Sequence, residues 1–417
     1  MKKFIFLPVC EALLLALLCA CQNIPASVEN PWENMTFQVG GVKQFNDDPL
    51  SYQRLEYVAA EKFCRDYGCA KVEFIISSGG DDLAAAILAG SPWDLQLVYA
   101  TPAFPTAFFG GLYQPLGSFL NETDSRLDKK ALEAAAWQGK HYGISNLWMQ
   151  DISYSLYDED DFRRLGIKTP YERWREGSWN SDGFLEMAKE IKQAGAKYDV
   201  NVYRPNVVGR YMAEWNQGEA EITYGSTESQ VWLTLWQKFI AHPTYRFSDG
   251  DGPGLGETGM IYSDDVIPNL MKNEIASGGE GKRYIHFPQN GSGAGTYVNG
   301  AFFMVPAGVD VAKMPAAVEL AARFCAEDGN ARRQMYEKYM TEEDFALLCQ
   351  NLESAYFLPH FPAADAWQVI GPKFVSDMQA GKPVQQHIAE ALVWLDENKM
   401  KQNEKGKTWL EKEFLKP

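Results

Sequence analysis

The chain has 417 residues, of which 46% are apolar and 23% charged, and this describes a folded protein too long for a single hydrophobic core. We therefore expect two domains. The net charge of −16 argues against nucleic acid and anionic lipid as partners, because this charge has the wrong sign for phosphate groups.

The N-terminal segment has the form of an export signal. Lys2 and Lys3 precede an apolar body that ends in a Leu-Cys-Ala-Cys run at Cys21. Because this pattern is typical of a bacterial lipoprotein, we predict removal of residues 1–20, lipidation of Cys21 and a tether over residues 21–34. The body would be anchored to the cell membrane and face its outer side. An ordinary signal peptide is an alternative; Pro8 and Glu11 argue against a spanning anchor, which needs roughly 20 apolar residues.

From residue 35 onward, strand and helix patterns alternate. Leu55, Val58, Ala59 and Phe63 have the spacing of a buried helix face, and Gly68 is a helix stop. The expected order is a strand at 36–39, a helix at 51–67, a strand at 72–76, a helix at 81–90 and a strand at 95–99. Short connections of this kind predict an α/β fold with parallel strands. Ligands bind such sheets beyond the carboxyl ends of the strands, which here are residues 43–46 and 100–104.

Several motifs in the first part of the chain resemble those of one family. A helix ending at Gly90 precedes Pro92, Asp94 and a buried strand; residues 111–116 read Gly-Leu-Tyr-Gln-Pro-Leu, and residues 139–145 read Gly-Lys-His-Tyr-Gly-Ile-Ser. These features resemble the family 1 extracellular solute-binding proteins of ABC transporters. Ser145 stands in place of the usual proline of that family.

A second group of matches lies between residues 157 and 188. Tyr157 and Phe162 resemble a strand end of the same family, residues 165–171 resemble its Gly-Ile-x-x-Pro turn, and Trp179 with Phe184 resembles the opening of a helix. Residues 158–160, Asp-Glu-Asp, replace the preferred Asn-Lys. Later, residues 305–308 and a helix at 316–326 resemble the return to the first lobe, so the matches span about residues 35–326.

The resemblance implies an α/β, two-lobe periplasmic-binding-protein fold of type II, with a ligand held between hinged lobes. It implies an N-terminal lobe of residues 35–148 and 299–328 and a C-terminal lobe of residues 149–298 and 329–417. The crossings are expected near residues 145–151, 297–301 and 326–330. A ligand that contacts both lobes would then drive a hinge closure.

Candidate binding residues follow from the chemistry of sugars. Sugars present apolar faces and a rim of hydroxyls, so their sites combine aromatic rings with planar polar groups. Trp148, inside the first crossing, and Trp367, where similar maltose-binding proteins carry a stacking aromatic, are the first ring candidates; Tyr211 and Trp215 are the second. The other candidates lie at crossings or loops: Lys43, Gln44, Thr101, Phe104, Asp151 and Asn299. For each of them, a packed or a solvated residue is an equally open interpretation.

The cysteines and histidines predict no metal site. Besides Cys21, the mature chain has Cys64, Cys69, Cys325 and Cys349, which form no CxxC pattern. In an exported protein Cys64 could pair with Cys69 across the helix end, but buried thiols are the favoured interpretation. The five histidines lack metal-ligand spacing, and we expect no cofactor.

The leading hypothesis is a non-enzymatic, monomeric binding lipoprotein that captures a sugar or oligosaccharide and delivers it to the permease subunits of an ABC importer. Its only contact with the membrane would be the lipid anchor. One alternative is an exported glycoside-active enzyme, which would need two catalytic carboxylates flanking a sugar. Another is a binding protein for a non-sugar solute such as a peptide or a polyamine.

Overall fold

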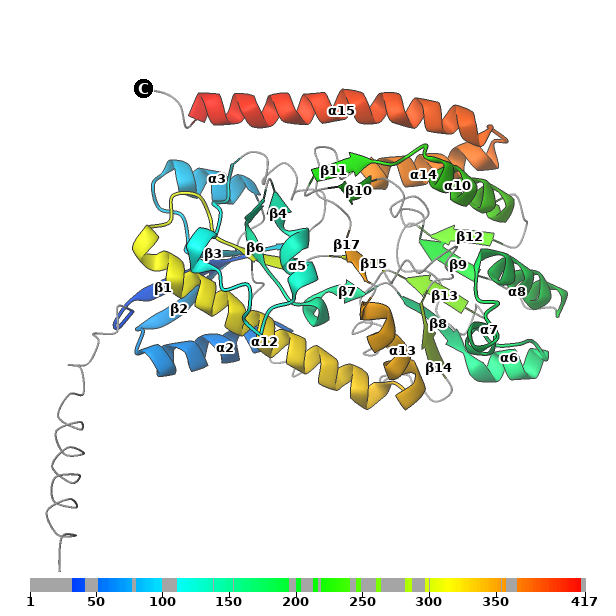
Figure 1. Cartoon of the computed structure of the whole chain (residues 1–417), viewed down its shortest axis with the longest axis horizontal. Coiled ribbons are helices and arrows are strands. Elements are labelled where there is room, and N and C mark those ends of the chain that lie inside the picture. Colours follow the sequence, from blue (N-terminus) through cyan, green and yellow to red (C-terminus); the bar gives the residue numbers. More distant parts are fainter. Residues whose placement is uncertain are drawn as a thin grey trace, which may run out of the picture.

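Two five-stranded sheets lie at opposite ends of the molecule, and a three-stranded sheet lies between them (Figure 1). The computed structural model describes residues 32–41, 52–76, 80–99, 111–137, 139–152, 154–194, 200–203, 213–216, 219–240, 245–248, 260–263, 282–286, 297–299, 301–353, 355–357 and 366–413. The predicted signal and Cys21 lie outside these residues. None of the described helices combines the length and apolar character that a membrane span requires.

The first sheet combines strands that are far apart in the sequence. Its order is β2 (Lys71–Ile75), β1 (Thr36–Gly40), β3 (Leu95–Tyr99), β16 (Ala301–Met304) and β6 (Gly143–Ile144). β1 is parallel to β2 and β3, as predicted, whereas β16 is antiparallel to β3 and β6. Phe37 and Val39 are fully buried, because alternate side chains of a strand point to the same face. The helices of this end include α2 (Tyr52–Tyr67), α3 (Gly80–Leu88) and α12 (Met314–Tyr339).

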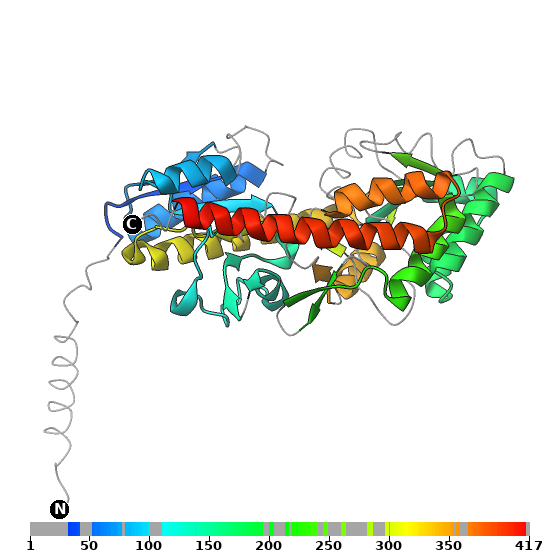
Figure 2. The same ribbon diagram turned by 90° about the horizontal axis from the view of Figure 1, so that it is seen from above.

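The second sheet is mixed as well. Its order is β12 (Tyr245–Ser248), β9 (Val200–Tyr203), β13 (Met260–Ser263), β8 (Tyr154–Asp158) and β14 (Lys282–Ile285). β9 is parallel to β12 and β13, and β8 is antiparallel to β13 and β14. The helices near it are α6 (Glu159–Leu165), α7 (Pro170–Arg175), α8 (Ser181–Gln193), α10 (Thr227–Ile240), α14 (Ala366–Gln379) and α15 (Val384–Glu413). In both views α15 begins at this end and runs back toward the first sheet (Figures 1 and 2).

The middle sheet consists of short strands. Its order is β17 (Tyr356–Phe357), β15 (Tyr297–Asn299) and β7 (Asp151–Ile152). The helix α13 (Glu342–Glu353) lies between α12 and this sheet along the chain. The remaining elements are η1 (Gly117–Phe119), α5 (Lys129–Ala134), β4 (Ala136–Trp137), β5 (Lys140–His141), η2 (Leu147–Met149), β10 (Ala213–Asn216), β11 (Glu219–Ile222) and η4 (Val311–Lys313).

Capping residues explain where the helices α6 and α7, which follow β8 of the second sheet, begin. Asp158 caps α6, since its carboxylate accepts from two backbone N–H groups of the first turn, and Gly166 ends that helix in the left-handed region. Thr169 and Glu172 form a capping box at α7, with Pro170 in the first helical position. The acidic run at residues 158–160 is therefore the beginning of a helix, where negative charge is favourable.

The structure corrects two expectations. Cys64 and Cys69 form a disulfide at the end of α2, so the favoured interpretation of these two as buried thiols is wrong; Cys325 is a buried thiol, and Cys349 is a half-buried one. The helix expected at 316–326 continues as α12 to Tyr339. Residues 326–330 therefore lie inside one unbroken helix.

Candidate functional site

The candidate site is the junction around the middle sheet. Residues 145–150 lead from β6 of the first sheet into β7 of the middle sheet, and a single residue separates β15 of the middle sheet from β16 of the first. These are two of the segments that the sequence assigns to crossings. Both connect a strand of the first sheet to a strand of the middle sheet over a few residues of chain.

A buried polar clamp joins the two crossings. The Gln150 Oε1 accepts a hydrogen bond from the Ala301 N–H at 2.7 Å, and the Gln150 Nε2 donates to the Ala301 carbonyl at 3.2 Å and to the Asn146 carbonyl at 2.9 Å. Ser145 Oγ donates to the same Ala301 carbonyl at 2.6 Å and contacts Gln150 Nε2. Because Ser145 and Gln150 are fully buried, a lost partner would leave a polar group unsatisfied. The serine that replaces the family's proline thus has a structural role.

α12 forms a third connection beside this clamp. Asn146 approaches α12 so closely that a Cβ on Gly329 would lie 3.0 Å from its Oδ1. Arg332 Nη1 donates to the Gln150 carbonyl at 3.4 Å. The glycine therefore serves a close approach of the first crossing to the helix and does not end it.

Trp148 lies within the first crossing, on η2. Its ring is stacked on Phe345 with centroids 6.0 Å apart and lies 5.9 Å from the ring of Tyr336. The guanidinium of Arg333 lies 5.7 Å from the same ring. Trp148 is half-buried and packs against an apolar cluster that contains residues of α12 and α13, so part of its ring surface is already occupied.

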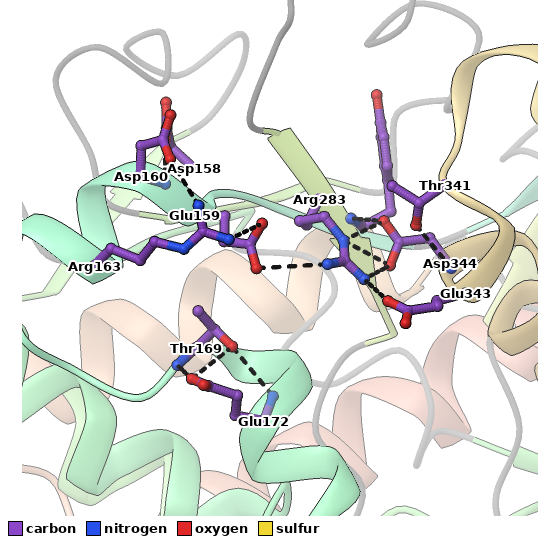
Figure 3. A network of polar contacts seen from close by, with 11 residues as sticks. Asp158, Glu159, Asp160, Arg163, Thr169, Glu172, Arg283, Thr341, Glu343 and Asp344 are labelled. Atoms are coloured by element: carbon purple, nitrogen blue, oxygen red, sulfur yellow. Dashed lines mark hydrogen bonds and ion pairs between the residues drawn. The ribbon is translucent and has the colours of Figure 1, made fainter.

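On the side of the second sheet, Arg283 on β14 anchors α13 (Figure 3). Its Nε lies 2.9 and 3.0 Å from the Asp344 carboxylate oxygens, and its Nη2 lies 2.8 Å from Asp344 Oδ1. A carboxylate oxygen of Glu343 lies 3.1 Å from Arg283 Nη2, and one of Glu159 lies 3.5 Å from Arg283 Nη1. Burial alone would lower the pKa of Arg283, but the hydrogen bonds that Arg283 donates to Asp344 outweigh burial, and the pKa is raised.

The structure places five of the predicted binding residues and brings two of them together. Asp151 on β7 and Asn299 on β15 are registered partners in the middle sheet. Trp215 lies on β10 and Trp367 on the first turn of α14. Lys43, Gln44, Thr101, Phe104 and Tyr211 lie outside the described residues.

Sequence reasoning missed the residues that hold the junction together. Gln150 and Arg332 carry no motif, and their role depends on contacts with residues far away in the chain. The replacement of proline by Ser145 was the available signal, since a serine can donate where a proline cannot. Among the described residues, no group of three or more histidine, cysteine, aspartate or glutamate side chains could hold a metal ion.

Comparison with solved structures shows the fold. The galacto-N-biose-/lacto-N-biose I-binding protein of an ABC transporter from Bifidobacterium longum, in complex with lacto-N-biose, matches with a TM-score of 0.68 at 13% identity, over 88% of this chain and 98% of that chain. An ABC substrate-binding protein from Listeria monocytogenes, in complex with cycloalternan, matches with a TM-score of 0.59 at 15% identity, over 87% of this chain and 98% of that chain.

A third match binds a different kind of solute. UgpB from Mycobacterium tuberculosis, in complex with glycerophosphocholine, matches with a TM-score of 0.64 at 13% identity, over 88% of this chain and 98% of that chain. No family model and no curated protein sequence matches the chain. The fold predicted from sequence, with two α/β lobes as in periplasmic solute-binding proteins, is confirmed.

Proposed function

We propose that this chain, with the two-lobe fold of ABC-transporter solute-binding proteins, captures a sugar or oligosaccharide between its lobes and delivers it to an importer. The observation that carries the proposal is the match over 87–88% of the chain to proteins solved with lacto-N-biose and cycloalternan. The match spans both lobes and the junction, and a two-lobe protein traps a ligand by closing over it.

The ligand is proposed to bind beside the middle sheet. Asp151 and Asn299 support this, because their registered positions put a carboxylate and an amide on neighbouring strands at the two crossings. Such planar polar groups donate to and accept from hydroxyls. The full proposed set is Lys43, Gln44, Thr101, Phe104, Trp148, Asp151, Tyr211, Trp215, Asn299 and Trp367.

The lobe boundaries and the anchoring remain part of the proposal. We assign residues 35–148 and 299–328 to the first lobe and residues 149–298 and 329–417 to the second. Lipidation at Cys21 would hold the mature chain at the outer side of the cell membrane, next to the permease subunits that receive its ligand. The Cys64–Cys69 disulfide supports export, since disulfides persist in oxidising compartments. The binding protein is proposed to act as a monomer and without catalysis.

A ligand panel tests the proposal. The purified chain is heated with lacto-N-biose, cycloalternan, maltotetraose or glycerophosphocholine, and thermal unfolding is followed. A ligand present at about 100 times its Kd stabilises by about 2.7 kcal/mol, which is readily measured. Stabilisation by a sugar supports the proposal, and the same sugar must be recovered uncleaved.

The panel also separates the alternatives. Stabilisation by glycerophosphocholine alone would favour a non-sugar solute, the second candidate, which the match to UgpB supports. Shorter sugars appearing with time would favour an enzyme. Trp367→Ala should lower the affinity for a stabilising sugar by about 1–3 kcal/mol without changing the unfolding temperature of the free chain. Trp236→Ala is the matched control, since Trp236 is a buried core residue and its loss should lower stability instead.

A further inference from the structure

A buried acid lies between α2 and α12, next to the junction. Glu56 of α2 is only 6% exposed, and within the described part of the chain its Oε2 has no hydrogen-bond partner. Asp328 of α12 is 4% exposed, and Arg332 is 7% exposed. Two buried carboxyl groups, those of Glu56 and Asp328, therefore lie near a single guanidinium group, that of Arg332.

This acid cluster is connected directly to the crossings. Arg332 Nε donates to Asp328 Oδ1 at 3.2 Å, and Arg332 Nη1 donates to the Gln150 carbonyl at 3.4 Å. Gln150 in turn holds Ala301 of the other crossing through the polar clamp. Any change in charge between α2 and α12 thus acts on the groups that support both crossings.

The electrostatics favour a protonated Glu56. Burial raises the pKa of Glu56 and the neighbouring Asp328 charge raises it further, to about 8, while Arg332 opposes the shift. The pKa of Asp328 is raised by burial as well, against the effect of Arg332. The Cys325 thiol lies near Asp328 and is neutral, because burial raises its pKa well above the ordinary value. The other described charged groups that join α2 and α12 are paired: Lys62 with Glu327 at 2.5 Å and Asp66 with Arg323 at 2.6 Å, while the Tyr67 hydroxyl donates to Glu319 at 3.2 Å.

We propose that Glu56 is a proton-dependent lock on the interlobe junction, which holds α12 against α2 while Glu56 is neutral and loosens the crossings when its proton is lost. Ionisation would place a second anion beside Arg332 in a site that water does not reach, and this is costly. Conformations in which α12 moves away from α2 and water enters are then favoured. At alkaline pH the two crossings should therefore open more often, whatever ligand the protein binds.

Hydrogen exchange of the ligand-free chain tests this proposal. Peptides covering residues 143–152 and 297–304 are compared between the wild type and Glu56→Gln at several pH values from 4.5 to 9. The ratio of the wild-type to the variant exchange rate should be smallest at pH 4.5, because a Glu56 that reaches water recovers its ordinary pKa of 4.5. The ratio should rise by up to about tenfold per pH unit until about pH 8, the pKa of the buried group, and level off above that pH.

A second variant keeps the proposal falsifiable if Glu56→Gln folds poorly. Asp328→Asn removes the neighbouring charge that helps to raise the pKa of Glu56, so the pH at which the profile levels off should move to lower values. Glu61→Gln, on the same helix but exposed, is the control and should leave the profile unchanged. Equal rates for wild type and Glu56→Gln at pH 9, or an unmoved levelling-off pH in Asp328→Asn, would overturn the proposal. Neither result depends on the identity of the ligand, so they are separate from the ligand panel.

Discussion

Two buried ionic clusters flank the junction, and each has more carboxyl groups than guanidinium groups. Around Arg283, the extra carboxylates reach solvent, since the side chain of Glu159 is 23% exposed and that of Glu343 is 61% exposed. Around Arg332, the extra carboxyl group is Glu56, which is buried. In the second cluster Glu56 holds a proton at neutral pH, because burial and the Asp328 charge raise its pKa to about 8. Access to water, more than the number of charges, decides how a buried cluster behaves.

The largest effect is expected from breaking the charged pair in the first cluster. Asp344→Ala leaves the Arg283 guanidinium with its peripheral contacts to Glu159 and Glu343 and its position over the Tyr171 ring. Removal of one partner of a buried pair costs about 3–5 kcal/mol. Urea unfolding measures the loss. A loss below about 1 kcal/mol would mean that the exposed carboxylates can replace Asp344 and that the two clusters differ less than described.

A smaller, pH-dependent effect is expected at Glu56. Its pKa is raised in the folded state from 4.5 to about 8, so the proton-linked stability is fully present below about pH 4.5 and is lost as the pH rises through about 8. Glu56→Gln lacks this linkage. The free energy of unfolding of the wild type, relative to the variant, should fall by on the order of 3 kcal/mol between pH 5 and pH 9. Parallel pH profiles of the two proteins would show that Glu56 does not bind a proton on folding.

The uncharged clamp between the clusters should be less costly to break. Gln150→Ala removes the acceptor for the Ala301 N–H and the donor to two carbonyls, for an expected loss of about 1–3 kcal/mol. This loss should be the same at pH 5 and pH 9, because no group of the clamp titrates. Ser145→Ala removes the donor to the Ala301 carbonyl and the acceptor for Gln150 Nε2, and should cost about 1 kcal/mol. If the loss of unfolding free energy in Gln150→Ala depended on pH, the clamp and the acid cluster would be energetically coupled and could not be compared as separate features.

The smallest effect is expected at the rim of the first cluster. Glu343 contacts Arg283 at 3.1 Å but is mostly exposed, so Glu343→Ala should change the free energy of unfolding by about 0–1 kcal/mol. The change should disappear in 0.5 M salt, which screens exposed pairs. An effect as large as that of Asp344→Ala would remove the distinction between buried and solvated carboxylates in this cluster.

Local patterns were sufficient for much of the first lobe. The strand at 95–99 and the helix stop at Gly68 were predicted as they occur, because alternation and a left-handed glycine are properties of a few adjacent residues. The unbroken course of α12 was not predicted: a crossing was expected near residues 326–330, which lie inside the helix where Gly329 approaches Asn146. For the same reason the clamp at Gln150 was missed: its partner Ala301 is 151 residues away. Of the candidate binding residues, only the pairing of Asp151 with Asn299 became visible.

The strand order of the first sheet also affects how the chain can be made. β6 pairs only with β16 within the described sheet, and β16 begins at residue 301. At about 5–20 residues per second, a ribosome needs roughly 10–30 s after completing β6 before it supplies that partner. During this interval the emerging lobe has an unfinished sheet and lacks the helix that packs on α2. The first sheet can therefore be completed only after all five strands of the second sheet have been made, since β14 ends at Ile285 and β16 begins at Ala301.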